Sequence, residues 1–285
     1  MSTNNDQVND YFANVEDPGE RDRLIKLDGF MTDAMGGIFP EMQFHGGERV
    51  FDAACGPGGW AIRLARAWPS VQSVGIDISN HMIAYANGYV EAGVRNASFL
   101  VGNIKGRLPF EDASFDAVNA RFLETFMRPQ DWHGFLAECH RILKPGGTIR
   151  LTESEATISP LSPNFEKMTF LFVKAMKCLG IGYSQHGMWN TAMLQPHLRD
   201  AGYEQIKYRA TAIDSSYGTA YHESVYLSYY YGGKAVVPFY EEHGMLEPGD
   251  DVKETYRLAL QEMRDPSFVG LGYALTCWGR KPMTV

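Results

Sequence analysis

A glycine-rich turn between two regular elements constrains the fold of this chain more than any other feature. The turn, VFDAACGPGG at 50–59, follows the short apolar run Arg49–Ala53 and opens the helix expected at Gly59–Trp68. Glycine allows positive φ angles and close approach of a ligand to the backbone. The next apolar run ends in Asp77, 21 residues after Gly56, where a carboxylate can accept both hydroxyl protons of a ribose. The combination predicts a nucleoside-binding site.

The chain then alternates between strand-like and helix-like segments. We expect further strands at Ser73–Ile78, Ala97–Val101, Phe115–Asn119 and Thr148–Glu153, with helices at Asn80–Ala92 and Asp131–Leu143. Such alternation is typical of an α/β fold, a parallel sheet with helices on both faces. We expect a single domain with an N-terminal helical cap over residues 1–47, including a helix at Arg21–Met35, and a cofactor-binding core over 48–155.

The composition changes after residue 155. We expect the remaining segments to be helices at Glu166–Leu179, Thr191–Ala201 and Asp251–Met263, strands at Glu204–Ile213 and Leu271–Trp278, and an aromatic segment at Tyr217–Tyr240. We interpret residues 156–285 as the last strands of the core together with helical insertions that form a lid over a site.

Two nucleoside cofactors are compatible with the glycine turn. Gly56, Gly58 and Ala61 fit G-x-G-x-x-A, the fingerprint of an NAD-type dinucleotide site. Asp52 opposes that interpretation, because a buried carboxylate would repel a pyrophosphate. The same carboxylate favours a cationic amine or a sulfonium. An NAD(P)-dependent oxidoreductase is therefore the less favoured alternative.

Several motifs together resemble the class I S-adenosylmethionine (SAM)-dependent methyltransferases, especially the small-molecule branch similar to ubiquinone and menaquinone biosynthesis enzymes. After the glycine turn come GIDIS at 75–79, GN at 102–103, LPFEDASFDAV at 108–118 and RILKPGG at 141–147, in the order of that family. The resemblance is strong over 48–155 and extends loosely to AGY at 201–203 and WGRKP at 278–282. It implies a Rossmann-like, seven-stranded, mostly parallel sheet and an enzyme that converts SAM to S-adenosylhomocysteine.

The resemblance also assigns contacts to the methionine end of SAM. Asp52 and the turn backbone would face the methionine moiety, with the backbone contacts supplied by Ala54, Cys55, Gly56 and Gly58. Arg121 would lie near the same moiety. Tyr11 and Arg23 would close over its carboxylate, as a cap helix does in some relatives.

The adenosine end has its own implied contacts. Asp77 would bind the ribose hydroxyls and Ile78 would pack on the adenine, while Asn103 would bind the adenine amino group with Ile104 beside the ring. Asn103 replaces the usual aspartate and still offers a carbonyl acceptor. Ala54 replaces the first glycine of the motif, and we expect a small effect provided that its φ angle is negative.

No catalytic motif is visible, since methyl transfer mainly requires that nucleophile and methyl group be held in line. Candidate general bases are Glu153, Glu124 and His186, each of which also has an ordinary structural explanation. Candidate substrate-pocket residues are Phe170, Tyr226, Tyr229 and Tyr230, which would equally serve as lid core. If they line a pocket, the acceptor is a mid-sized, partly apolar metabolite of secondary or cofactor metabolism.

Composition limits the partners. The net charge of -8 argues against nucleic acid and anionic membranes, which require basic surface. The polar N-terminus and the absence of a long apolar run predict a cytoplasmic protein without membrane insertion. The four cysteines are far apart, so we expect no metal site. Two further alternatives are a SAM-binding enzyme that catalyses a cyclisation and a SAM-binding regulatory subunit.

Overall fold

The computed structural model describes residues 18–184 and 186–283 of the 285-residue chain. Within these residues, seven strands form one sheet in the order β3-β2-β1-β4-β5-β7-β6. The strands are β1 (Arg49–Ala53), β2 (Gln72–Asp77), β3 (Ala97–Val101), β4 (Phe115–Arg121), β5 (Leu143–Ser154), β6 (Glu204–Asp214) and β7 (Leu271–Arg280). Strands β1 to β5 pair in parallel, and β7 runs antiparallel between β5 and β6. The expected seven-stranded, mostly parallel sheet is confirmed.

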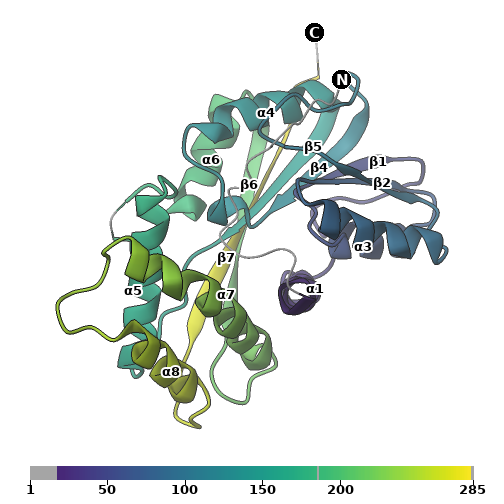
Figure 1. The fold of residues 1–285 in the computed structure, drawn as a ribbon. Coiled ribbons are helices and arrows are strands. Elements are labelled where there is room, and N and C mark those ends of the chain that lie inside the picture. The colour runs from purple at the N-terminus through teal and green to yellow at the C-terminus, as the bar shows by residue number, and fades with distance from the viewer. Residues whose placement is uncertain (1–17, 185, 284–285) are drawn as a thin grey trace, which may run out of the picture.

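Helices cover both faces of the sheet (Figure 1). The α-helices of the described residues are α1 (Pro18–Ala34), α2 (Gly59–Ala67), α3 (Asn80–Glu91), α4 (Asp131–Ile142), α5 (Pro163–Cys178), α6 (Asn190–Asp200), α7 (His222–Glu242) and α8 (Val252–Met263). Side chains alternate between the two faces along each strand. In β1, Phe51 packs with the α4 and α6 side of the sheet, whereas Val50 packs with α2 and α3.

The C-terminal insertions form a second hydrophobic core. Helices α5, α7 and α8 gather beyond one end of the sheet (Figure 1) and bury, among others, Phe165, Met176, Tyr240 and Met263. The aromatic segment expected at Tyr217–Tyr240 becomes α7, a helix that extends to Glu242. Helix α1 lies between this group, here called the lid helices, and the glycine turn, and it packs against both α7 and α2.

Segment boundaries agree with the sequence expectations to within a few residues. The largest difference is β5, which begins at Leu143 rather than at Thr148, because the KPGG segment that ends α4 continues the sheet. Leu143 pairs with Phe115 ahead of a register shift in β4. In the part of the chain that the structure describes, no helix combines the length and apolar character needed to cross a membrane.

Candidate active site

A cavity of about 450 Å³ lies where the carboxyl ends of β1, β2 and β4 meet helix α1 and the lid helices. Ligands in open α/β sheets bind at this edge, where the loops after neighbouring strands diverge. Its core-side wall includes Asp52, Ala54, Cys55, Gly56, Asp77, Ile78, Asn103, Ile104, Arg121 and Glu124. Its lid-side wall includes Met168, Phe172, Ser228, Tyr229, Val236, Tyr240, Tyr256 and Met263. The cavity therefore joins the glycine turn to the interior of the lid.

The glycine turn is crowded at one of its positions, Gly58. Gly58 has a φ of 78°, and a Cβ built there would lie 2.9 Å from both Ala86 and the Phe99 ring. Gly56 has a φ of 54° and open space at the corresponding position. Ala54 does not meet the condition of a negative φ under which a small effect is expected, because its φ is 53°. Ala54 thus occupies the left-handed region that the family's glycine enters without strain.

Asp77 closes the turn from the second strand. Its Oδ2 accepts a hydrogen bond from Gly56 N at 2.9 Å, and its Oδ1 accepts one from Ser79 N at 2.9 Å. Burial raises the pKa of this carboxyl, and the backbone donors oppose the shift. Each carboxylate oxygen keeps a further acceptor site, since an ionised carboxylate accepts about four bonds. Asn103 lines the same region and accepts a bond from Lys105 N through Oδ1 at 2.9 Å.

Asp52 lies at the other end of the turn. Its Oδ1 accepts a hydrogen bond from Asn119 Nδ2 at 2.7 Å. Burial raises its pKa to about 7, while Arg121 and Asn119 lower it. Arg121 forms an ion pair with Asp28 of α1 and donates to Thr32 Oγ1 at 3.1 Å. An acid, a guanidinium and a second acid therefore lie together against the cavity.

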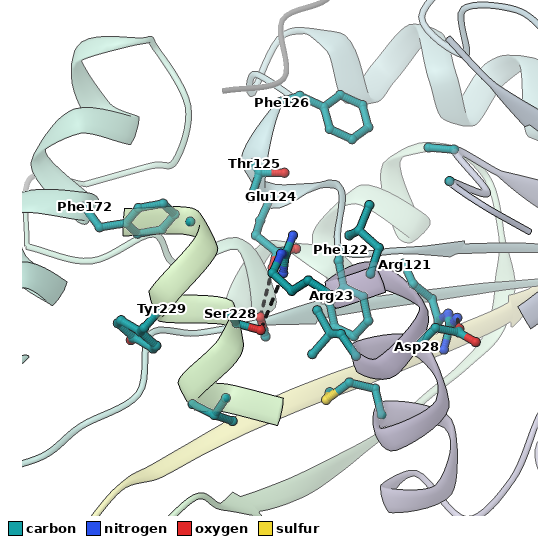
Figure 2. A pocket seen from close by; sticks show the side chains of 18 of the residues that line it. Arg23, Asp28, Arg121, Phe122, Glu124, Thr125, Phe126, Phe172, Ser228 and Tyr229 are labelled. Atoms are coloured by element: carbon teal, nitrogen blue, oxygen red, sulfur yellow. Dashed lines mark hydrogen bonds and ion pairs between the residues drawn. The ribbon is translucent and has the colours of Figure 1, made fainter. Parts of the chain in front are cut away.

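Helix α1 faces α7 across the cavity (Figure 2). Arg23 extends from α1 towards Ser228 of α7, with Nη1 at 3.5 Å from the serine Oγ. Arg23 and Asp28 both line the cavity. Tyr11, the other cap residue that the resemblance named, lies outside the described residues.

Glu124 and Glu153 form a pair of carboxyl groups with different surroundings. Glu153 is fully buried, and it accepts bonds from Leu123 N at 3.0 Å and Glu124 N at 2.9 Å. Glu124 lines the cavity and accepts a bond from Ser154 Oγ at 2.9 Å through Oε1. Its Oε2 is buried and has no N–H or hydroxyl donor among the described residues, while the carboxyl group as a whole interacts with the adjacent carboxyl of Glu153. Burial raises the pKa of Glu124, and burial with the adjacent Glu124 raises that of Glu153 well above its usual value.

Comparison with known proteins identifies the family. A family described as a methyltransferase domain matches residues 50–147. Demethylmenaquinone methyltransferase of Staphylococcus saprophyticus subsp. saprophyticus is 30% identical over 171 residues, 59% of this chain and 71% of that protein. The Staphylococcus aureus enzyme is 32% identical over 174 residues, 60% of this chain and 68% of that protein. The chain belongs to the class I SAM-dependent methyltransferases.

Solved methyltransferase structures share the fold. Phosphoethanolamine N-methyltransferase 2 of Haemonchus contortus, solved with SAM, aligns with a TM-score of 0.55 and 18% identity, covering 88% of this chain and 52% of that one. Geranyl diphosphate methyltransferase aligns with a TM-score of 0.51 and 15% identity, covering 90% of this chain and 77% of that one. This methyltransferase uses SAM as its methyl donor, so the dinucleotide alternative is wrong.

The structure brings most of the expected cofactor contacts of the methyltransferase to one cavity. The expected contacts that line it are Arg23, Asp52, Ala54, Cys55, Gly56, Asp77, Ile78, Asn103, Ile104 and Arg121. Gly58 lies behind the turn, where it allows α3 and β3 to approach. Most of these positions could be predicted from the sequence because they follow strand ends at family spacings, and their contacts with the cofactor stay a prediction.

Only some of the predicted catalytic and substrate-binding residues line the cavity. Glu124 and Tyr229 line the cavity, but Glu153 lies beneath it and His186 is solvent-exposed. Phe170 is 56% exposed on the outer side of α5, and its neighbour Phe172 lines the cavity instead. The periodicity of α5 explains this correction, since residues two apart on a helix point in different directions.

Two other tyrosines of α7 also lie outside the cavity wall. Tyr226 packs under the guanidinium of Arg264, whose Cζ is 3.6 Å from the ring centroid, and Tyr230 binds Lys234. The wall instead includes residues that sequence analysis missed, among them Asp28, Phe122, Tyr240 and Tyr256. Tyr240 and Tyr256 come from different lid helices, so only their packing reveals that they share a cavity. Asp28 has a sequence signal, a carboxylate on the apolar side of the expected first helix.

Proposed function

We propose that this methyltransferase transfers the methyl group of SAM to an oxygen, nitrogen or carbon nucleophile of a mid-sized, partly apolar small molecule. This proposal rests on one observation, the continuity of the cavity. One cavity runs from the glycine turn and Asp77 to the apolar interior of the lid. A nucleoside donor at one end and an acceptor at the other would meet at its centre, beside Glu124 and Phe122.

The core-side wall fits the adenosyl group of SAM. We assign Asp77 to the ribose hydroxyls, because its backbone bonds fix both oxygens and leave acceptor sites for two more donors. Ile78 and Ile104 would supply apolar surface for the adenine ring, and we assign the Asn103 carbonyl to its amino group. The open space at Gly56 gives the ligand access to the turn backbone.

The methionine end fits the acidic and basic groups near β1 and β4. We assign the carboxylate of Asp52 to the ammonium group of the cofactor, and Arg121 and Arg23 to its carboxylate. Asp28 holds the Arg121 guanidinium in place through their ion pair. When bound, SAM supplies an electrophilic methyl group whose leaving sulfur needs no protonation.

The lid-side wall favours an acceptor without phosphate groups. Of the residues that the structure describes, those of α5, α7 and α8 that line the cavity carry no charge. They are aromatic, aliphatic or small, and they include Phe172, Val236 and Leu260. A phosphate at such a wall would lose its hydration without gaining an ion pair from the lid helices, and Arg23, which reaches Ser228, is assigned to the carboxylate of SAM. A hydroxylated, mostly apolar acceptor meets no such cost.

Glu124 is the residue best placed to receive the proton of the acceptor. It lines the cavity, and its Oε2 has no N–H or hydroxyl donor among the described residues, its carboxyl group being paired with that of Glu153. Glu153 holds the backbone N–H groups of Leu123 and Glu124, which fixes the 3₁₀ turn η1 (Leu123–Thr125). We therefore propose that Glu124 is the general base and that Glu153 supports it.

The test begins with binding and continues with a panel of acceptors. Calorimetric titration with SAM, S-adenosylhomocysteine and NADH should show binding of the two sulfur nucleosides and none of NADH. The panel pairs a prenylated naphthoquinol, suggested by the curated relatives, with phosphoethanolamine and geranyl diphosphate, suggested by the solved structures. We expect release of S-adenosylhomocysteine and a methylated product only with uncharged acceptors. Release with the phosphorylated acceptors alone would contradict the proposed acceptor class.

A further inference from the structure

A row of polar side chains crosses the middle of the sheet beneath the cavity. Asp52, Asn119 and Arg150 occupy directly paired positions on β1, β4 and β5. They lie on the face opposite Phe51, Val118, Ile149 and Leu151, whose side chains pack with α4 and α6. Neighbours in register on adjacent strands point to the same side of a sheet. The pairing therefore brings a carboxylate, an amide and a guanidinium into one line.

Short contacts connect the whole row. Arg150 Nη1 donates to Asn119 Oδ1 at 2.9 Å, and Asn119 Nδ2 donates to Asp52 Oδ1 at 2.7 Å. At the other end, Arg150 Nε lies 3.0 Å from Glu41 Oε2, and Arg209 Nη2 donates to Glu41 Oε1 at 2.6 Å. Asn119 and Arg150 are fully buried, and Asp52 is 4% exposed.

A buried arginine at this position is costly and needs a physical reason. Apolar residues of similar volume are often neutral or stabilising when they replace a buried ion pair. The distinctive property of arginine is that it only donates hydrogen bonds and keeps its proton. It therefore forces the carbonyl oxygen of Asn119 to face β5. The amide nitrogen of Asn119 must then face β1 and donate to Asp52.

We propose that Arg150 is a positioning residue of the cofactor site, which acts through the amide of Asn119 to keep Asp52 charged for the ammonium group of the cofactor. This inference rests on the assignment of Asp52 under the proposed function. Without Arg150, the amide of Asn119 is free to rotate and present its oxygen to the carboxylate, which would favour the protonated acid.

Three charged groups besides the cofactor act on Asp52. They are Arg121 at the end of β4, Asp28 on α1 and Arg150 on β5. Burial raises the pKa of Asp52 to about 7, against the lowering effects of Arg121, Asn119 and Arg150. A ligand with an ammonium group binds the ionised acid, so its affinity rises with pH up to about 7 and then levels off.

The experiment compares two ligands that differ at the methionine end. S-adenosylhomocysteine carries the ammonium group, whereas 5′-methylthioadenosine lacks the amino-acid portion and shares the contacts to Asp77. Calorimetric titration of the whole chain from about pH 5.5 to about pH 8.5 gives the ratio of the two affinities. We expect this ratio to rise about tenfold per pH unit below the pKa of Asp52 and to become constant above it.

Variants then test the role of Arg150. In Arg150→Met, we expect the midpoint of the ratio to move to higher pH and the ratio at pH 7 to fall by about tenfold, with 5′-methylthioadenosine binding unchanged. Asn119→Leu should give the same change, and Arg150→Lys should restore part of the wild-type profile. Arg141→Met removes a guanidinium that pairs with Glu138 and Asp112 outside the cavity, so its profile should match the wild type.

The outcomes that overturn the proposal are distinct from failure of the proposed function. A wild-type ratio below one at every pH, so that the ligand with the ammonium group gains no affinity from Asp52, would overturn it even if no variant folds. Folded Arg150→Met and Asn119→Leu proteins with an unmoved midpoint would show that the row is only structural. Failure of both ligands to bind the wild type would instead contradict the assignment of the core-side wall.

Discussion

At the scale of single residues, Asp77 combines two properties that a ribose-binding carboxylate needs. Backbone N–H groups of Gly56 and Ser79 fix its oxygens, and the carboxyl lines the cavity. Asp77→Ala should therefore weaken S-adenosylhomocysteine binding by about tenfold or more, because hydrogen bonds to charged groups contribute about 1.5–3 kcal/mol each. Calorimetry measures the change. Asp112→Ala is the control, because it removes an exposed carboxylate that pairs with Arg141. This variant should bind S-adenosylhomocysteine with wild-type affinity.

The second residue-scale prediction concerns Glu124. Its raised pKa means that the ionised base accumulates only as pH rises, so kcat should increase with pH through that pKa. Glu124→Gln should lower kcat by about 10²- to 10⁴-fold, abolish this pH dependence and leave S-adenosylhomocysteine affinity unchanged. Release of S-adenosylhomocysteine with the acceptor found in the panel measures kcat. A Gln variant with wild-type kcat would show that the acceptor needs no base from this side chain.

At the scale of elements, the turn between β1 and α2 depends on the close approach of α3 and β3. The Cβ of Gly58→Ala would meet Ala86 and Phe99 at 2.9 Å and would sit at a φ of 78°. We expect the free energy of unfolding to fall by about 1–3 kcal/mol, from overpacking and from the unfavourable φ. Urea denaturation measures this loss.

A glycine on the adjacent helix provides the control for that variant. Gly88 lies within α3, and a Cβ built there has no neighbouring atom within 4 Å. Gly88→Ala should therefore stabilise the protein by about 0.5–1 kcal/mol, the usual gain in helix propensity. Equal effects of the two alanine substitutions would contradict the close packing around Gly58.

At the scale of the whole molecule, the cavity is enclosed by segments far apart in sequence. Helix α1 covers it from one side and the lid helices from the other, with Arg23 reaching Ser228 between them. We predict that helix α1 and the lid helices move apart to admit the acceptor and close over bound ligands. S-adenosylhomocysteine should slow hydrogen exchange in peptides from α1 and α7. Peptides from α4 serve as the control, and unchanged exchange in α1 and α7 would argue against the hinge.

The order of helices and strands could be predicted from the sequence because it depends on local patterns. Apolar runs, glycine turns and caps such as Ser79 and Asp251 act within a few residues along the chain. The family motifs also predict the positions of Asp77 and Asn103, because both stand at strand ends that the motifs mark, and their contacts with the cofactor stay a prediction. The division into cap, core and lid stays a prediction.

Tertiary structure alone decided the acceptor end of the site. Phe172 rather than Phe170 faces the cavity because the direction of a side chain on α5 depends on how that helix packs against α8. Glu124 rather than Glu153 reaches the cavity because backbone N–H groups from η1 occupy the Glu153 carboxyl. The row from Asp52 to Arg150 exists only through the register of three strands. These contacts are made between residues tens of positions apart, so they depend on tertiary packing and cannot be predicted from local sequence patterns.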